Sequence, residues 1–140
     1  MNAFIWAVLA ALVWGVVPIF EKVGLRQTMP LAGLFYRSVG VMVGMLLLGF
    51  FMVKPQEIRS VDIRSALCLM AGGFLASFIA QIFFYNSLKV GEVSRIVPLA
   101  GSYPLIAFLL GVLLLGESVT PFKMVGVLLV LSGVWFLKLG

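Results

Sequence analysis

The stretch that decides the fold is GEVSRIVPLAGSYPLIAFLLGVLLLGES, residues 91–118. No residue between Arg95 and Glu117 is charged, and two prolines, Pro98 and Pro104, lie in this stretch. An apolar helix needs about 20 residues to cross the hydrocarbon core of a bilayer, so this run is long enough to span a membrane. A water-soluble helix rarely tolerates prolines in its interior. The stretch therefore predicts a membrane-spanning helix that is interrupted along its length.

The composition of the whole chain indicates the same environment. Of its 140 residues, 63% are hydrophobic and 11% are charged, whereas a soluble domain carries about 25% charged residues. We therefore expect the outer surface to contact the lipid bilayer. The net charge of +5 comes from basic residues that stand singly at the ends of apolar runs. This distribution is typical of charges at a membrane interface and does not indicate nucleic-acid binding.

The segments between charged residues predict five membrane-spanning helices. They cover about residues 3–20, 31–53, 65–88, 96–116 and 122–137. Only short loops remain, so the predicted fold is an all-α membrane protein, a bundle of five transmembrane helices in a single domain, residues 1–140. The first span lacks a basic leading segment and is longer than the roughly 7–15 apolar residues of a signal peptide. We expect it to be a retained helix rather than a cleaved signal.

Residues suited to catalysis or metal binding are scarce. The chain contains no histidine and a single cysteine, Cys68, and its few acidic residues are not clustered. We therefore expect no enzymatic activity, no catalytic residues, no metal and no cofactor.

The loop charges barely distinguish the two faces of the predicted bundle. One face collects four basic residues: Lys54, Arg59, Arg64 and Lys123. The other collects five: Lys22, Arg26, Lys89, Arg95 and Lys138. An excess of Lys and Arg marks the cytoplasmic side, and here the excess is one residue, or two if Arg37 points outward. Two interpretations stay open: a few charges fix one orientation, or the chain inserts both ways and pairs with an inverted copy.

A polar stripe marks the third predicted span. Ser77, Gln81 and Tyr85 follow one another at four-residue spacing, with Asn86 beside them, so they share one face of an α-helix. Polar groups in a lipid-embedded helix face inward. They either form hydrogen bonds between helices or line a cavity, and we take them as cavity candidates.

Two charged residues are further candidates. Arg37 lies about 10 Å inside the second span, at about 1.5 Å per residue, and charged groups at that depth are functional candidates. It either extends to the interface, pairs with Glu21 across the first hairpin, or faces a substrate.

The prolines of the fourth span point to a third set of candidates. Pro98 and Pro104 lack an N–H, so the carbonyls of Ser94 and Ala100 lose their usual helical donor. Free carbonyls at membrane depth occur where protein or a wet cavity receives them. The alternative is a plain kink that improves packing. Pro98 is close to the helix start, so Pro104 and its neighbour Tyr103 are the better cavity candidates.

Small residues recur at helical spacing in four of the spans, which predicts close helix packing within the chain or against a second subunit. They are Ala3, Ala7, Ala11 and Gly15; Gly40 and Gly44; Gly72, Ala76 and Ala80; and Gly126 and Gly133.

Taken in order, these features resemble the EamA domain of the drug/metabolite transporter superfamily. The segments that carry the resemblance are WGVVPIFEKVGL (14–25), FFYNSLKVGEVSRIVPLAGSYPLIAFLLGVLLLGES (83–118) and KMVGVLLVLSGVWFL (123–137). The resemblance covers essentially the whole chain. It implies a multi-pass carrier of small organic metabolites or drug-like compounds, in the cell (inner) membrane of a prokaryote.

Most members of this family carry two such domains in inverted orientation, so the resemblance implies that this chain is half of a ten-helix inverted-repeat architecture. The expected partner is a second copy, possibly antiparallel, or a paralogous second half. The expected mechanism is alternating access around a site near the midplane. Small multidrug carriers of the superfamily use a carboxylate in the middle of the first helix, and no acid lies mid-membrane here. Glu21 is therefore only a candidate gating or coupling charge. A non-transporting membrane scaffold or accessory subunit is the alternative function.

Overall fold

The computed structural model describes residues 2–139, which form helices and connecting loops without any strand. Five helical segments are long and apolar enough to cross a membrane: Ala3–Leu25, Pro30–Phe51, Ile63–Val90, Val93–Leu115 and Pro121–Leu139. Nearly all of their large apolar side chains are exposed to the surroundings, as expected for helices that lipid solvates. The predicted fold class, an all-α membrane protein with five transmembrane helices, is confirmed.

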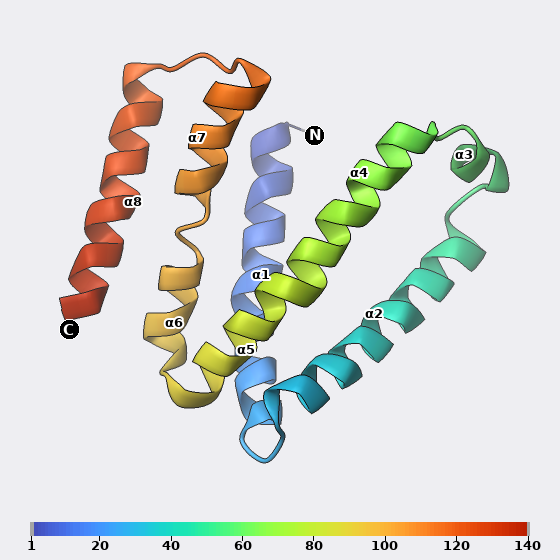
Figure 1. The fold of residues 1–140 in the computed structure, drawn as a ribbon, viewed down its shortest axis with the longest axis horizontal. Helices are drawn as coiled ribbons and strands as arrows, with labels where there is room; N and C mark the ends of the chain where they lie inside the picture. The colour runs from blue at the N-terminus through green and yellow to red at the C-terminus, as the bar shows by residue number, and fades with distance from the viewer. Residues whose placement is uncertain (1, 140) are drawn as a thin grey trace. The chain divides into compact units, whose positions relative to one another are not determined.

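Two of the five segments are composite (Figure 1). The first, second and fifth are single helices, α1 (Ala3–Leu25), α2 (Pro30–Phe51) and α8 (Pro121–Leu139). The third joins α4 (Ile63–Phe74), the π-helical turn η1 (Leu75–Ile79) and α5 (Ala80–Val90), and the fourth joins α6 (Val93–Ala100) and α7 (Pro104–Leu115). A short helix, α3 (Pro55–Arg59), lies in the loop after α2.

The first, third and fifth helical segments extend further than the spans read between charged residues, whereas the second, Pro30–Phe51, ends two residues before its predicted end. α1 continues through Glu21 and Lys22 to Leu25 rather than ending near Phe20. Glu and Lys are good helix formers, so the first charge after an apolar run does not end the helix.

By its internal contacts the chain divides into two units, residues 1–90 and 91–140. In the first unit, α5 packs against both α2 and α1. Its buried core is small and lies where α1 and α5 end and α2 begins: Leu25, Leu34, Tyr85 and Leu88. Gly33 permits this approach, because a Cβ at this position would lie 2.9 Å from Leu25 Cδ2 and 3.3 Å from Tyr85 Cε2.

Two lysines join the ends of α1 and α5 reciprocally. Lys22 of α1 donates to the carbonyl of Leu88 at 2.6 Å, near the end of α5. Lys89 of α5 donates to the carbonyl of Leu25 at the end of α1 and to those of Arg26 and Thr28 in the turn that follows. The last carbonyls of a helix lack intrahelical donors and carry partial negative charge, so each lysine stabilises the other helix's C-terminus.

In the second unit, α6 and α7 both pack against α8. Arg95 of α6 donates from Nη2 to the carbonyl of Lys138 at 2.9 Å, near the end of α8. α7 ends at Leu115 and is followed by Gly116, whose φ of 66° is left-handed, and the Glu117 N–H donates to the Gly111 carbonyl at 3.1 Å. This is a glycine-terminated helix end.

The fourth span is interrupted, as the two prolines predict. α6 ends at Ala100 and α7 begins at Pro104. The Ala100 carbonyl accepts from the Tyr103 N–H at 3.4 Å, within a tighter turn. The backbone around the break is therefore satisfied partly by the turn itself.

Candidate functional site

Glu21 is the centre of the polar cluster in the first unit. It lies four residues before the end of α1, about 6 Å along the helix axis, and its side chain is only 10% exposed. A carboxylate that leaves water needs compensating donors or charges. The structure provides them from two other elements.

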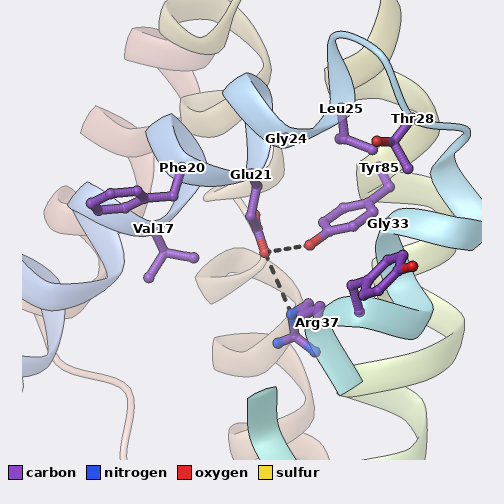
Figure 2. A pocket seen from close by; sticks show the side chains of 10 residues that line it. Val17, Phe20, Glu21, Gly24, Leu25, Thr28, Gly33, Arg37 and Tyr85 are labelled. Carbon is purple, nitrogen blue, oxygen red and sulfur yellow. Dashed lines mark hydrogen bonds and ion pairs between the residues drawn. The ribbon is translucent and has the colours of Figure 1, made fainter. Parts of the chain in front are cut away.

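Two side chains donate hydrogen bonds to a single oxygen of Glu21, Oε1, and a third forms an ion pair with it. The Arg37 Nε from α2 lies 3.4 Å away in an ion pair. From α5, Gln81 Nε2 and the Tyr85 hydroxyl donate at 3.1 and 3.0 Å. Figure 2 shows Arg37 and Tyr85 approaching the carboxylate from two directions. The cluster therefore ties together α1, α2 and α5.

Of the three interpretations of Arg37, pairing with Glu21 across the first hairpin is the one seen. Tyr85 is 3% exposed, so its hydroxyl would be unsatisfied without the carboxylate. The polar groups of this cluster are thus mutually dependent, and removing one leaves another without its partner.

A pocket of about 510 Å³ adjoins the cluster (Figure 2). Its lining residues come from α1, the following turn, α2 and α5: Val17, Phe20, Glu21, Gly24, Leu25, Thr28, Gly33, Tyr36, Arg37 and Tyr85. The volume falls within the range of small-molecule sites, about 300–1,000 Å³. Most of the lining is apolar or aromatic, with two opposite charges at one place.

The pocket lies toward one end of the spans rather than near their middle. Glu21 is about 6 Å from the end of α1, and Arg37 is about 10 Å from the start of α2. The lining residues include Thr28 from the α1–α2 turn. A pocket at this level opens close to one membrane surface.

Ser77 and Asn86 are not part of the cluster. Ser77 lies in η1 and is half-buried, and its hydroxyl makes no hydrogen bond with any residue of 2–139. A π-turn carries an extra residue, so it breaks the four-residue register between Ser77 and Gln81. Asn86 is exposed and donates to the Ile82 carbonyl of its own helix at 2.8 Å.

Tyr103 and Pro104 belong to the second unit. They mark the break between α6 and α7: Pro104 is the first residue of α7, and Tyr103, which is 58% exposed, directly precedes it.

Sequence reasoning missed most of the pocket wall. Phe20, Gly24, Thr28, Gly33 and Tyr36 were not among the predicted site residues, although all line the pocket. The available signal was the hairpin itself, because residues just before and after a tight turn face each other across it.

In the described part of the chain, no three His, Cys, Asp or Glu side chains gather closely enough to hold a metal ion. The chemistry available to the pocket is therefore binding by charge, hydrogen bonds and apolar contact.

The fold and the pocket define a class: an integral, multi-pass membrane protein with a small-molecule-sized site between its first helices. Comparison with known families then gives the particular family. The model of the EamA-like transporter family matches residues 1–139, so the chain belongs to this family. Membership in this family indicates that the protein is a membrane transporter and points away from an enzymatic function.

Three relatives illustrate how the chain compares with known proteins. It is 26% identical over 141 residues to an uncharacterized protein of Methanocaldococcus jannaschii, covering 99% of this chain and 97% of the relative. It is 26% identical over 128 residues to an uncharacterized transporter of a Sinorhizobium species, with 91% and 90% covered. It is 22% identical over 142 residues to an uncharacterized transporter of Archaeoglobus fulgidus, covering 98% of this chain but 48% of the relative. No solved structure matches.

Proposed function

We propose that this chain carries small organic metabolites or drug-like compounds across a prokaryotic cell membrane, and that it works as a dimer by alternating access. The observation that carries the proposal is the pocket of about 510 Å³ beside the Glu21 cluster, in a chain of a transporter family. Intramembrane charges that face a cavity are typical of substrate pathways. Glu21, Arg37, Gln81 and Tyr85 are its proposed contacts, with Glu21 as the candidate gating charge.

Two observations support a partner chain. The Archaeoglobus fulgidus relative is about twice the length that this chain covers, so two copies, or a copy and a paralogue, match its size. Gly40 and Gly44 on α2 and Gly126 and Gly133 on α8 have open space where a Cβ would lie. Small residues of this kind permit close approach of another helix.

The prokaryotic assignment rests on the relatives, which come from two archaea and one bacterium. The proposed roles of Ser77, Asn86, Tyr103 and Pro104 are secondary, because the hydrogen bonds of the first unit centre on Glu21.

The test is flux through the purified protein in liposomes, with a panel of labelled cationic, anionic, zwitterionic and neutral solutes. Gln81→Leu removes one donor to Glu21, and we expect it to reduce flux about tenfold or more while membrane insertion is retained. Gln56→Leu, at an exposed position in α3, is the matched control and should transport normally.

Equal flux through both variants would contradict the assignment of Gln81. Absence of flux for every solute, together with a stable complex with another membrane protein, would favour the alternative function of scaffold or accessory subunit.

A further inference from the structure

The segment that joins α2 to α4, residues 52–64, contains three basic side chains without an acidic partner, and we call it the α3 segment. Lys54 precedes α3, Arg59 is the last residue of α3, and Arg64 lies in the first turn of α4. All three residues are exposed. Neither of the ion pairs found within residues 2–139 involves any of them.

The two acidic residues of the α3 segment accept hydrogen bonds from the backbone instead. Glu57 Oε2 accepts from the Lys54 N–H at 3.4 Å, at the start of α3. Asp62 Oδ2 accepts from the Ser65 N–H at 3.0 Å, at the start of α4. A carboxylate in this position satisfies N–H groups that lack an acceptor within the helix and complements the positive end of the helix dipole. The acidic side chains therefore stabilise two helix starts and leave the basic side chains available to an external anion.

The α3 segment lies at one end of two membrane-spanning helices. It connects the end of α2 with the start of α4 (Figure 1), and both helices belong to segments long and apolar enough to cross a membrane. Apolar side chains alternate with the basic ones along it, and Met52, Ile58 and Ile63 are 73%, 64% and 75% exposed. This interleaving is typical of a segment at the headgroup level, where apolar groups enter the acyl boundary and basic groups reach the phosphates.

We propose that the α3 segment binds the headgroups of anionic phospholipids, with Lys54, Arg59 and Arg64 on the lipid phosphates. A guanidinium suits this role because its paired N–H groups match two phosphate oxygens, and a lysine adds a compact positive charge. Each basic residue close to an anionic membrane surface strengthens binding about fivefold. The inference concerns the lipid around the protein, so it does not rest on the proposed transport function.

The opposite end of α2 uses its neighbouring lysines differently. Lys22 donates to the carbonyl of Leu88 and Lys89 to that of Leu25, so both cations are engaged by helix ends. Arg26 is exposed at that end and forms no ion pair within residues 2–139. The α3 segment differs in bringing three unpaired cations together, which favours a multiply coordinated anionic headgroup there.

The test compares the binding of phosphatidylglycerol, which is anionic, with that of phosphatidylcholine, which has no net charge, at identical acyl chains. Each lipid is titrated into the full chain in a nonionic detergent, and bound lipid is measured by native mass spectrometry. We expect phosphatidylglycerol to bind about tenfold or more tightly. The triple variant Lys54→Gln, Arg59→Gln and Arg64→Gln should lose most of this preference and still fold, because all three side chains are exposed.

Further variants separate the named cations from charge in general. The double variant Arg59→Lys and Arg64→Lys keeps the charge of the α3 segment and should retain the preference for phosphatidylglycerol. Arg59→Gln alone should lower the preference about fivefold, which keeps the test decisive if the triple variant folds poorly. Arg26→Gln removes an exposed cation at the opposite end of α2 and should have a smaller effect than Arg59→Gln.

Four results would overturn the proposal. They are equal affinity of the unmodified chain for the two lipids, an unchanged preference in the folded triple variant, an effect of Arg26→Gln as large as that of Arg59→Gln, and competition by inorganic phosphate as effective as that by phosphatidylglycerol. The last result would assign the cations to a free anion rather than to a lipid. No flux is measured in these experiments, so their failure and the failure of the proposed transport function are distinguishable.

Discussion

At the scale of single residues, the polar cluster depends on one carboxylate oxygen. Oε1 of Glu21 receives Arg37, Gln81 and Tyr85, so residues far apart in the chain converge on one acceptor. A hydrogen bond to a charged group contributes about 1.5–3 kcal/mol when it is buried. The same contacts that position a ligand site therefore also hold the three helices together.

Gly33 offers a test of that packing. A Cβ there would lie 2.9 Å from Leu25 Cδ2 and 3.3 Å from Tyr85 Cε2, and both neighbours are buried. We expect Gly33→Ala to destabilise the protein by about 1–3 kcal/mol, the usual cost of overpacking. The measurement is the thermal unfolding midpoint in detergent.

The control for this prediction lies two turns further along α2. Gly40 has nothing within 4 Å of its ideal Cβ, so Gly40→Ala should be neutral or slightly stabilising, because alanine favours the helix over glycine. Equal destabilisation by both substitutions would show that the close contact at Gly33 is not responsible.

At the scale of helices, basic side chains bond the ends of neighbouring helices rather than merely marking the membrane surface. Lys22, Lys89 and Arg95 were interpreted from the sequence as interfacial charges, and each donates to carbonyls at the end of another helix. These contacts stabilise the fold because the last carbonyls of a helix have no hydrogen-bond donor within their own helix.

Lys89 donates to three carbonyls, that of Leu25 at the end of α1 and those of Arg26 and Thr28 in the turn that follows. We expect Lys89→Met to destabilise the protein by about 1–3 kcal/mol, since three backbone carbonyls, at the end of α1 and in the turn after it, lose a cationic donor. Hydrogen exchange of the amides in the last turn of α1 and in the α1–α2 turn should also accelerate.

The matched control is Arg26→Met. Arg26 lies in the same α1–α2 connection and carries the same charge, but only its backbone carbonyl takes part in the Lys89 contact. This variant also removes one positive charge at this end of the helices, and it keeps the contact. If the two variants lose the same stability, the effect arises from the lost positive charge and not from the contact with the helix end.

At the scale of the whole molecule, nearly all the large apolar side chains are exposed. The chain also covers only 48% of the length of the Archaeoglobus fulgidus relative. The two sets of loop basic residues differ by a single charge. These observations support the proposal that the chain pairs with an inverted copy of itself.

Dual insertion gives a direct prediction. With two reporters fused to the C-terminus, one active on each side of the membrane, we expect signal from both. Adding two lysines to the loop around α3, by Gln56→Lys and Ser60→Lys, raises that face from four basic residues to six and should hold it in the cytoplasm. Signal on one side alone from the unmodified chain would contradict an antiparallel pair and favour a parallel dimer or another partner.

Much of the architecture could be predicted from the sequence because a lipid environment permits few backbone structures. Apolar runs of about 20 residues must be helices, and Pro104 with Gly101 locates the break that separates α6 from α7. Glu21, Arg37, Gln81 and Tyr85 could be named for a similar reason, since polar groups are rare and conspicuous in apolar helices.

Only the tertiary structure decided which of these candidates meet. The π-turn at Leu75–Ile79 removes Ser77 from the register of Gln81, and no spacing rule for α-helices anticipates it. The pocket wall around Gly33 and the two reciprocal lysines depend on how closely α1, α2 and α5 approach. Hydropathy determines that a helix crosses the membrane, but the packing of side chains between helices determines which charged residues form ion pairs.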